Sequence, residues 1–125
     1  MKKKIFILGT LVLGCGLFAA AQVKQFDTDN DGTLDLAEVQ KAADAKFAHL
    51  DRDKDGTVSA REFPNSMSAN AVASGDTDND RTLDKAEYEK LVEQRFNAAD
   101  TDHDGTLTNA ELRTPAGRKL LDLIK

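Results

Sequence analysis

The sequence predicts an all-α protein in which four acidic loops are fused through short shared helices, giving a compact three-helix core plus a short C-terminal helix. Three observations support this prediction. A 12-residue acidic pattern recurs four times, the stretches between its copies have helical periodicity, and a last apolar stretch follows the fourth copy.

The repeated pattern occupies residues 27–38, 51–62, 76–87 and 100–111, called segments one to four below. The four copies read DTDNDGTLDLAE, DRDKDGTVSARE, DTDNDRTLDKAE and DTDHDGTLTNAE, and they align without gaps. They contain 18 of the 22 acidic residues of the chain. Packing so many carboxylates into four short windows costs repulsion unless a cation offsets it.

The spacers at 39–50, 63–75 and 88–99 are each long enough for one helix of about 18 Å. Apolar residues recur at three- and four-residue steps in the first and third spacers, which places Phe47 and Phe96 in the core. The second spacer contains Pro64 and several weak helix formers, so a short or broken helix is expected there. After a break at Thr114-Pro115, the tail predicts a short final helix.

Each segment places oxygen-bearing residues at positions 1, 3, 5, 7, 9 and 12, the pattern with which an EF-hand loop wraps Ca²⁺. Positions 1, 3 and 5 supply carboxylates, position 7 a backbone carbonyl, position 9 a direct or water-mediated contact, and position 12 both oxygens of a Glu. The predicted metal ligands are Asp27, Asp29, Asp31, Thr33, Asp35 and Glu38; Asp51, Asp53, Asp55, Thr57, Ser59 and Glu62; Asp76, Asp78, Asp80, Thr82, Asp84 and Glu87; and Asp100, Asp102, Asp104, Thr106, Thr108 and Glu111.

The four segments are not equivalent. Position 6 needs a positive φ, and Gly supplies it in segments one, two and four, whereas segment three has Arg81. A non-Gly residue there costs on the order of 1 kcal/mol and brings a positive charge near the cation. Segment three is therefore expected to bind more weakly than segment one. An apolar residue stands at position 8 of every segment, where it is expected to form a short strand contact with a partner loop.

The beginning of the chain predicts export. Three Lys, an apolar run from Ile5 to Phe18 and a small-residue site at 19–21 are typical of a signal peptide, with cleavage after Ala21. This division gives a signal peptide at 1–21 and a single EF-hand domain at 22–125, in the periplasm or secreted. An alternative is lipid anchoring at Cys15, because residues 12–15 resemble a bacterial lipobox. With a single Cys, no intrachain disulfide can form.

Charge and residue types narrow the possible partners. Without the leader, 14 basic residues face 22 acidic ones, a net charge of −8, which argues against nucleic acid and, unless Cys15 is lipidated, against membranes. The two His residues have no His or Cys at ligand spacing, so a zinc site is not expected. No His, Cys or Ser–base arrangement remains outside the segments, so no enzyme is predicted.

About 12 residues separate successive segments, so one helix must leave one loop and enter the next. Consecutive loops are therefore expected at opposite ends of a shared helix, where they cannot easily pair with each other. Four exported EF-hands fused in this way resemble the lanmodulin family of lanthanide-binding proteins. The resemblance includes the run from Asp80 to Tyr88, with Arg81 in place of Gly, and the tail Glu111-Leu112-Arg113-Thr114-Pro115-Ala116-Gly117, followed by Leu121 and Ile124. The chain departs from that family at position 2, where Thr28, Arg52, Thr77 and Thr101 replace Pro, and at position 9 in segments two and four.

Three functions are consistent with these observations. The first is calcium binding at up to four sites, as a buffer or as a metal-stabilised module. The second, which the resemblance implies, is selective binding and transport of lanthanide(III) ions, to which the five carboxylates of segments one and three are best suited. The third and weakest is a calmodulin-like sensor of target helices, since such sensors use Met-rich surfaces and only Met67 remains after the leader. The sequence indicates no particular protein partner.

Overall fold

The computed structural model describes residues 23–63 and 67–125. The expected signal peptide with Cys15, and Pro64 in the second spacer, lie outside these residues. Within the described part of the chain, no helix is long and apolar enough to cross a membrane.

Most of the described chain is helical, as predicted. After a helical turn at 23–26, the elements are β1 (Leu34–Asp35), α2 (Leu36–Leu50), β2 (Thr57–Ser59), α3 (Met67–Gly75), β3 (Thr82–Asp84), α4 (Lys85–Ala99), β4 (Thr106–Leu107), α5 (Asn109–Arg113) and α6 (Pro115–Ile124). The helices α2 and α4 begin inside segments one and three rather than after them, because position 9 acts as the helix N-cap.

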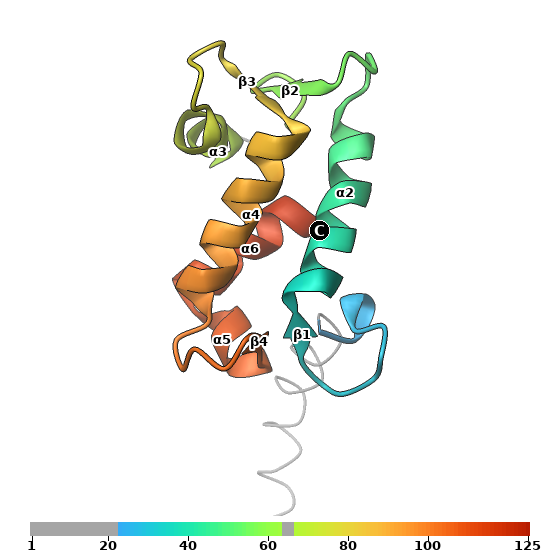
Figure 1. The fold of residues 1–125 in the computed structure, drawn as a ribbon, viewed down its shortest axis with the longest axis vertical. Coiled ribbons are helices and arrows are strands. Elements are labelled where there is room, and N and C mark those ends of the chain that lie inside the picture. The colour runs from blue at the N-terminus through green and yellow to red at the C-terminus, as the bar shows by residue number, and fades with distance from the viewer. Residues whose placement is uncertain (1–22, 64–66) are drawn as a thin grey trace, which may run out of the picture.

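The core lies between α2, α4 and α6, which pack against one another (Figure 1). The predicted apolar stripes face it, and Phe47 and Phe96 are both buried. The ring of Phe47 meets that of Tyr88 edge to face, with their centroids 5.4 Å apart. The third core helix is therefore the tail helix α6, and not the second spacer.

Three contacts fix α6 in this position. The buried Tyr88 hydroxyl donates a hydrogen bond to the Leu123 carbonyl oxygen at 2.6 Å, and Arg95 Nη1 donates to the Lys119 carbonyl oxygen at 2.7 Å. Gly117 lies so close to α5 that a Cβ there would collide with the backbone of Glu111 and Leu112. The chain turns between α5 and α6 at Thr114, whose side chain caps α6 ahead of Pro115.

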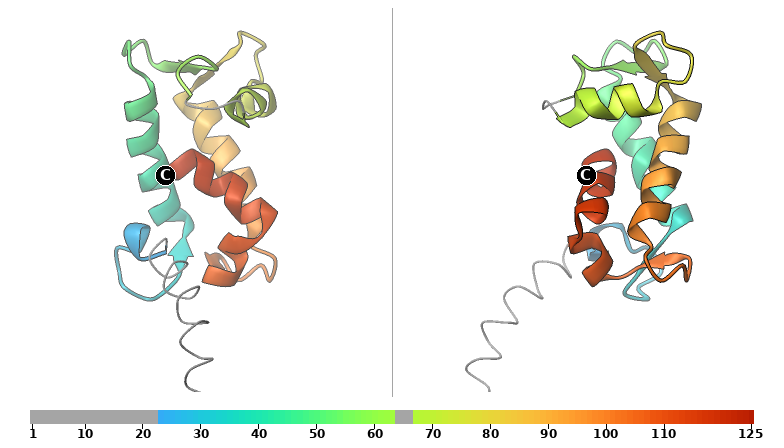
Figure 2. Two further views of the ribbon diagram at one scale, coloured as in Figure 1. Left: turned by 180° about the vertical axis from the view of Figure 1, so that it is seen from behind. Right: turned by 90° about the vertical axis from the view of Figure 1, so that its left-hand side faces the viewer.

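The second spacer forms only the nine-residue α3, as its sequence indicates, and this helix lies across one end of the molecule (Figure 2). It packs against α4 and β3. By contrast, α2 and α4 have 15 residues each and connect the two ends of the molecule.

The pairing of the segments differs in part from the expectation. Segments one and two lie at opposite ends of α2, and segments three and four at opposite ends of α4 (Figure 1). However, β2 pairs antiparallel with β3, so the consecutive segments two and three lie side by side, and β1 pairs with β4 at the other end. The expectation that consecutive loops cannot easily pair is wrong for segments two and three, because the spacer between them crosses one end instead of running the length of the molecule.

Candidate metal centres

Each segment winds around the Asp at its position 1. The backbone N–H of position 6 donates a hydrogen bond to this carboxylate at 2.8–3.0 Å in all four segments, including the N–H of Arg81. The N–H of position 5 donates to the carboxylates of positions 1 and 3 in the same way. These bonds turn the backbone so that three successive Asp side chains are gathered on one side.

Position 5 links each loop to its short strand. The Asp at this position accepts hydrogen bonds from the backbone N–H and the hydroxyl of the Thr at position 7, with distances of 2.8–3.0 Å in every segment. The Thr hydroxyl is thus used within the loop, which leaves the backbone carbonyl as the predicted position-7 ligand. One residue later, the apolar side chains meet across the strand pairs, Leu34 opposite Leu107 and Val58 opposite Leu83.

In segments one, three and four, the Glu at position 12 lies in the first turn of a helix and is held by the residue that caps this helix. In segments one, three and four, its backbone N–H donates to the position-9 side chain, and its carboxylate accepts from the position-9 N–H, forming a capping box. Glu38, Glu87 and Glu111 are only 6–7% exposed, so their carboxylates lie inside the loops. Position 9 itself (Asp35, Asp84 or Thr108) thus serves as a helix cap, a role that its assignment as a metal ligand did not include.

Position 2 has a role that the sequence did not reveal. Thr28, Thr77 and Thr101 donate both their backbone N–H and their hydroxyl to the position-12 Glu, at 2.7–3.3 Å. Pro at this position, as in the lanmodulin pattern, has no N–H to donate. In segment two, the N–H of Arg52 donates to the Leu50 carbonyl instead, and Glu62 is more exposed than its three counterparts.

Carboxylate oxygens converge in all four segments. One oxygen from each member of a cluster lies within 4.8 Å of the others, and the clusters are Asp27, Asp29 and Glu38; Asp51, Asp53 and Glu62; Asp76, Asp78, Asp80 and Glu87; and Asp100, Asp102, Asp104 and Glu111. Positions 1, 3 and 12 therefore meet everywhere, and position 5 joins them in segments three and four. Asp31 and Asp55 lie beside their clusters, bound to the Thr at position 7.

Backbone conformation confirms the expected strain in segment three. Gly32, Gly56 and Gly105 have φ of 82–84°, and Arg81 takes the same left-handed conformation at 69°. Position 4 is also left-handed in every segment, with Asn30, Lys54, Asn79 and His103 at φ of 54–60°. Asn tolerates this conformation better than most residues, so segments one and three are better suited to it than segments two and four.

The pKa values of the acidic residues shift in opposite directions at positions 3 and 5. At position 3, the shared hydrogen bond with the neighbouring Asp27 carboxyl raises the pKa of Asp29, and desolvation raises the pKa values of Asp53, Asp78 and Asp102. At position 5, hydrogen bonds from the Thr backbone lower the pKa values of Asp55, Asp80 and Asp104. At position 3, the metal-free loop thus disfavours the charged carboxylate, and a bound cation would favour it.

This arrangement fits a hard cation and defines the chain as a helical metal-binding protein. The donors are carboxylate oxygens backed by backbone groups, which suits ions such as Ca²⁺ rather than soft metals. A family model for the EF hand matches residues 22–42, 45–67 and 91–114, which are 21, 23 and 24 residues and together 68 of the 125. The chain belongs to the EF-hand family. No curated protein matches it.

The three matched stretches contain segments one, two and four in full, and none of them includes segment three. Segment three nevertheless has the same hydrogen bonds from positions 5, 6 and 7 and a cluster of four carboxylates. What separates it from the other three is Arg81 in place of the position-6 Gly.

Proposed function

We propose that the chain binds calcium at four sites, one in each segment, with the 24 ligands predicted from the sequence. The main support is the placement of the position-12 Glu. Its carboxylate lies beside those of positions 1 and 3 in all four segments, and the residue is buried in three of them. A cation held there would be coordinated by Asp oxygens from the loop and by a Glu from the first turn of the following helix. Binding would then fix the helix relative to the loop.

Export to the periplasm or secretion is part of this proposal, and it rests on the leader at 1–21 alone. The alternative location is a lipid anchor at Cys15. We assign the chain a metal-binding role without catalysis, as a buffer, a carrier or a metal-stabilised module. The calmodulin-like sensor remains the weakest alternative.

Lanthanide(III) binding is the second candidate. Segments one and three favour it, because each has five carboxylates and a trivalent ion gains more than a divalent one from each negative ligand. The Asp residues at position 9 of these two segments, Asp35 and Asp84, cap their helices, and their second oxygens would be available to a cation or its water.

Calorimetric titration tests the number of sites. We expect four bound ions per chain, and each of the single variants Glu38→Gln, Glu62→Gln, Glu87→Gln and Glu111→Gln is expected to remove one. Glu93→Gln, on the exposed face of α4, is the matched control and should leave the number at four. Unchanged stoichiometry in the four variants would refute the assignment of position 12.

Competition between Ca²⁺ and La³⁺, read by calorimetry and by helicity, separates the two candidate ions. Midpoints of similar concentration would support calcium as the functional ion. A La³⁺ response at concentrations many orders of magnitude below those of Ca²⁺ would support the lanthanide alternative.

A further inference from the structure

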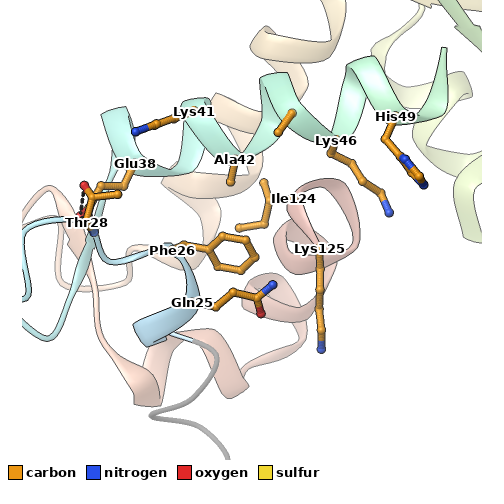
Figure 3. Close-up of a pocket in the computed structure, with 11 residues that line it drawn as sticks. Gln25, Phe26, Thr28, Glu38, Lys41, Ala42, Lys46, His49, Ile124 and Lys125 are labelled. Carbon is orange, nitrogen blue, oxygen red and sulfur yellow. Dashed lines mark hydrogen bonds between the residues drawn. The ribbon is translucent and has the colours of Figure 1, made fainter.

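An open groove lies beside segment one, between the turn at 23–26, α2 and the end of α6. Its volume is about 510 Å³, within the range of small-molecule sites. Figure 3 shows the ring of Phe26 beneath α2, with Ala42 above it and Ile124 beside it. Ala45, one turn further along α2, extends this apolar surface. Phe26 and Ala42 are only partly buried, so the groove exposes apolar surface to solvent.

The charges around the groove are opposite to those of the chain as a whole. Lys41, Lys46 and Lys125 line it, and so does His49. Figure 3 shows Lys46 extending from α2 toward the side of the groove where Lys125 lies. Two carboxylates belong to the lining residues, that of Glu38, whose oxygens already accept hydrogen bonds from Thr28 and Asp35 within segment one, and the terminal carboxylate of Lys125. Lys46 and Lys125 thus lie on the same side of the apolar floor, whereas Lys41 extends away from Phe26 toward segment one (Figure 3), in a chain whose net charge is −5.

We propose that this groove binds a single-chain anionic amphiphile, a small molecule with an aliphatic body and one acidic head group. The aliphatic body would lie on Phe26, Ala42, Ala45 and Ile124, and Lys46 and Lys125 would receive the acidic group. The flat face provided by two Ala residues on successive turns of α2 suits an unbranched chain. This proposal is independent of the proposed metal sites, because none of the groups assigned to the amphiphile belongs to a carboxylate cluster.

Charge selects this ligand over other occupants of an apolar groove. A second copy of the chain also has a net charge of −5, so it would bring many acidic groups to the groove rather than the one that Lys46 and Lys125 can receive. A neutral apolar molecule would leave these two ammonium groups without a counter-charge. An amphiphile with a single acidic group provides an apolar body for the floor of the groove and a counter-charge for the ammonium groups beside it.

Displacement of the fluorescent anion 1-anilinonaphthalene-8-sulfonate tests the proposal, with the full folded chain held at a Ca²⁺ concentration just sufficient for saturation. Decanoate, kept below its micelle concentration, is expected to displace the dye with a one-to-one stoichiometry. The uncharged 1-decanol should do so more weakly. Amide chemical shifts in the same titration should move at Ala42, Ala45 and Ile124, which localises the binding to the groove.

Matched variants separate the head-group contact from the floor. Lys46→Gln is expected to weaken decanoate binding about twofold to fivefold, the range of a partly exposed ion pair, whereas Lys90→Gln on α4 should leave it unchanged. Ala45→Trp fills the groove and should abolish binding. Ala48→Trp, an equally exposed position on the same helix that does not line the groove, should not affect it.

Three results would overturn the proposal. The first is equal affinity for decanoate and decanol, which would leave the ammonium groups without a role. The second is loss of binding in Ala48→Trp as well as Ala45→Trp when both variants retain wild-type helicity. The third is the absence of saturable decanoate binding, whether the chain then binds anionic phospholipid vesicles or forms a dimer that Ala45→Trp disrupts.

Discussion

At the scale of single residues, the position-12 Glu accepts hydrogen bonds from groups that do not themselves coordinate a metal. Thr at position 2 donates two hydrogen bonds to it in three segments, and the N–H of position 9 donates another. The backbone N–H of Asp84, and next that of Thr77, lower the pKa of Glu87 and so favour its charged form. Groups that orient a metal ligand in this way typically change affinity by about 10-fold to 100-fold when removed.

Segment two lacks the position-2 part of this support, although the N–H of Ser59 still donates to Glu62, and it therefore offers a gain-of-function test. Arg52→Thr would install a side chain able to reach Glu62, and it would also remove a positive charge beside the loop. We predict that it raises the metal affinity of segment two by roughly tenfold. Arg52→Gln removes the charge without adding a position-2 hydroxyl and should give a smaller increase. Equal affinities of the two variants, measured by calorimetry, would show that the Thr contact contributes nothing.

Arg81 combines two unfavourable effects that matched variants can separate. Arg81→Gln removes the positive charge but keeps a side chain at positive φ, whereas Arg81→Gly removes both. Both variants are expected to bind metal in segment three a few-fold more tightly, since the repulsion is lost. Only Arg81→Gly should also stabilise the metal-free chain, by about 1 kcal/mol of relieved backbone strain. Thermal unfolding with chelator measures this difference, and identical midpoints for both variants would contradict the strain.

The raised pKa values of the position-3 carboxyls predict how metal binding depends on pH. Their pKa values are raised in the metal-free loops, so protons compete for them at a higher pH than for an ordinary Asp. Metal binding requires the charged form, and affinity is therefore lost as the pH falls through these raised values. We expect the Ca²⁺ midpoint to begin rising at a higher pH than it would if these carboxyls had the ordinary Asp pKa. Asp78→Asn should flatten this dependence for segment three, and a midpoint constant down to pH 4 would contradict the prediction.

At the scale of elements, the tail helix completes the core that the spacers alone cannot form. The second spacer forms only the nine-residue α3, which lies across one end of the molecule, and α6 packs against α2 and α4 with Leu120, Leu123 and Ile124 buried. Its close approach to α5 depends on Gly117, where any side chain meets backbone atoms of Glu111 and Leu112. Glu111 is also the position-12 residue of segment four, so the packing of α6 and this candidate site share a backbone contact.

Gly117→Ala tests this contact. We predict a loss of stability of about 1–3 kcal/mol, the usual cost of overpacking, because backbone atoms must move to admit the methyl group. Metal affinity in segment four should fall with it, since Glu111 would be displaced. Arg118→Ala, at the exposed neighbouring position, should change neither quantity. Chemical unfolding and calorimetry of both variants provide the comparison, and a wild-type value for Gly117→Ala would show that α5 and α6 are not in close contact.

These elements also show how far the sequence can predict such a fold. The helices α2, α4 and α6, their buried stripes and the pairing of position-8 residues follow from periodicity and motif spacing, because those signals are local. The side-by-side placement of segments two and three does not, because it depends on the direction taken by α3, which no local pattern specifies. The position-2 contacts were also missed, since Thr there is unremarkable until the fold brings Glu38 or Glu87 next to it.

At the scale of the whole molecule, the carboxylate clusters form two pairs at opposite ends. Segments one and four meet through β1 and β4, and segments two and three through β2 and β3 (Figure 1). Each end therefore concentrates the charge of two clusters, while α2 and α4 connect the ends. A cation that binds at one end relieves repulsion in both loops of its pair and fixes the first turn of a helix that leads to the other end.

The metal-free chain is expected to be loosely folded for this reason, and to gain helix when metal binds. Charge repulsion opposes the strand pairs at both ends, and a small core without disulfides has little stability to spare. Binding free energy then becomes folding free energy. Circular dichroism with and without chelator measures the change, and the expected result is a clear rise in helicity on adding Ca²⁺. The quadruple variant with Gln at positions 38, 62, 87 and 111 should show no rise, whereas Glu93→Gln should respond like the unmodified chain. Equal helicity with and without metal in the unmodified chain would mean that the core between α2, α4 and α6 is stable on its own, and that metal binds to a fold already formed.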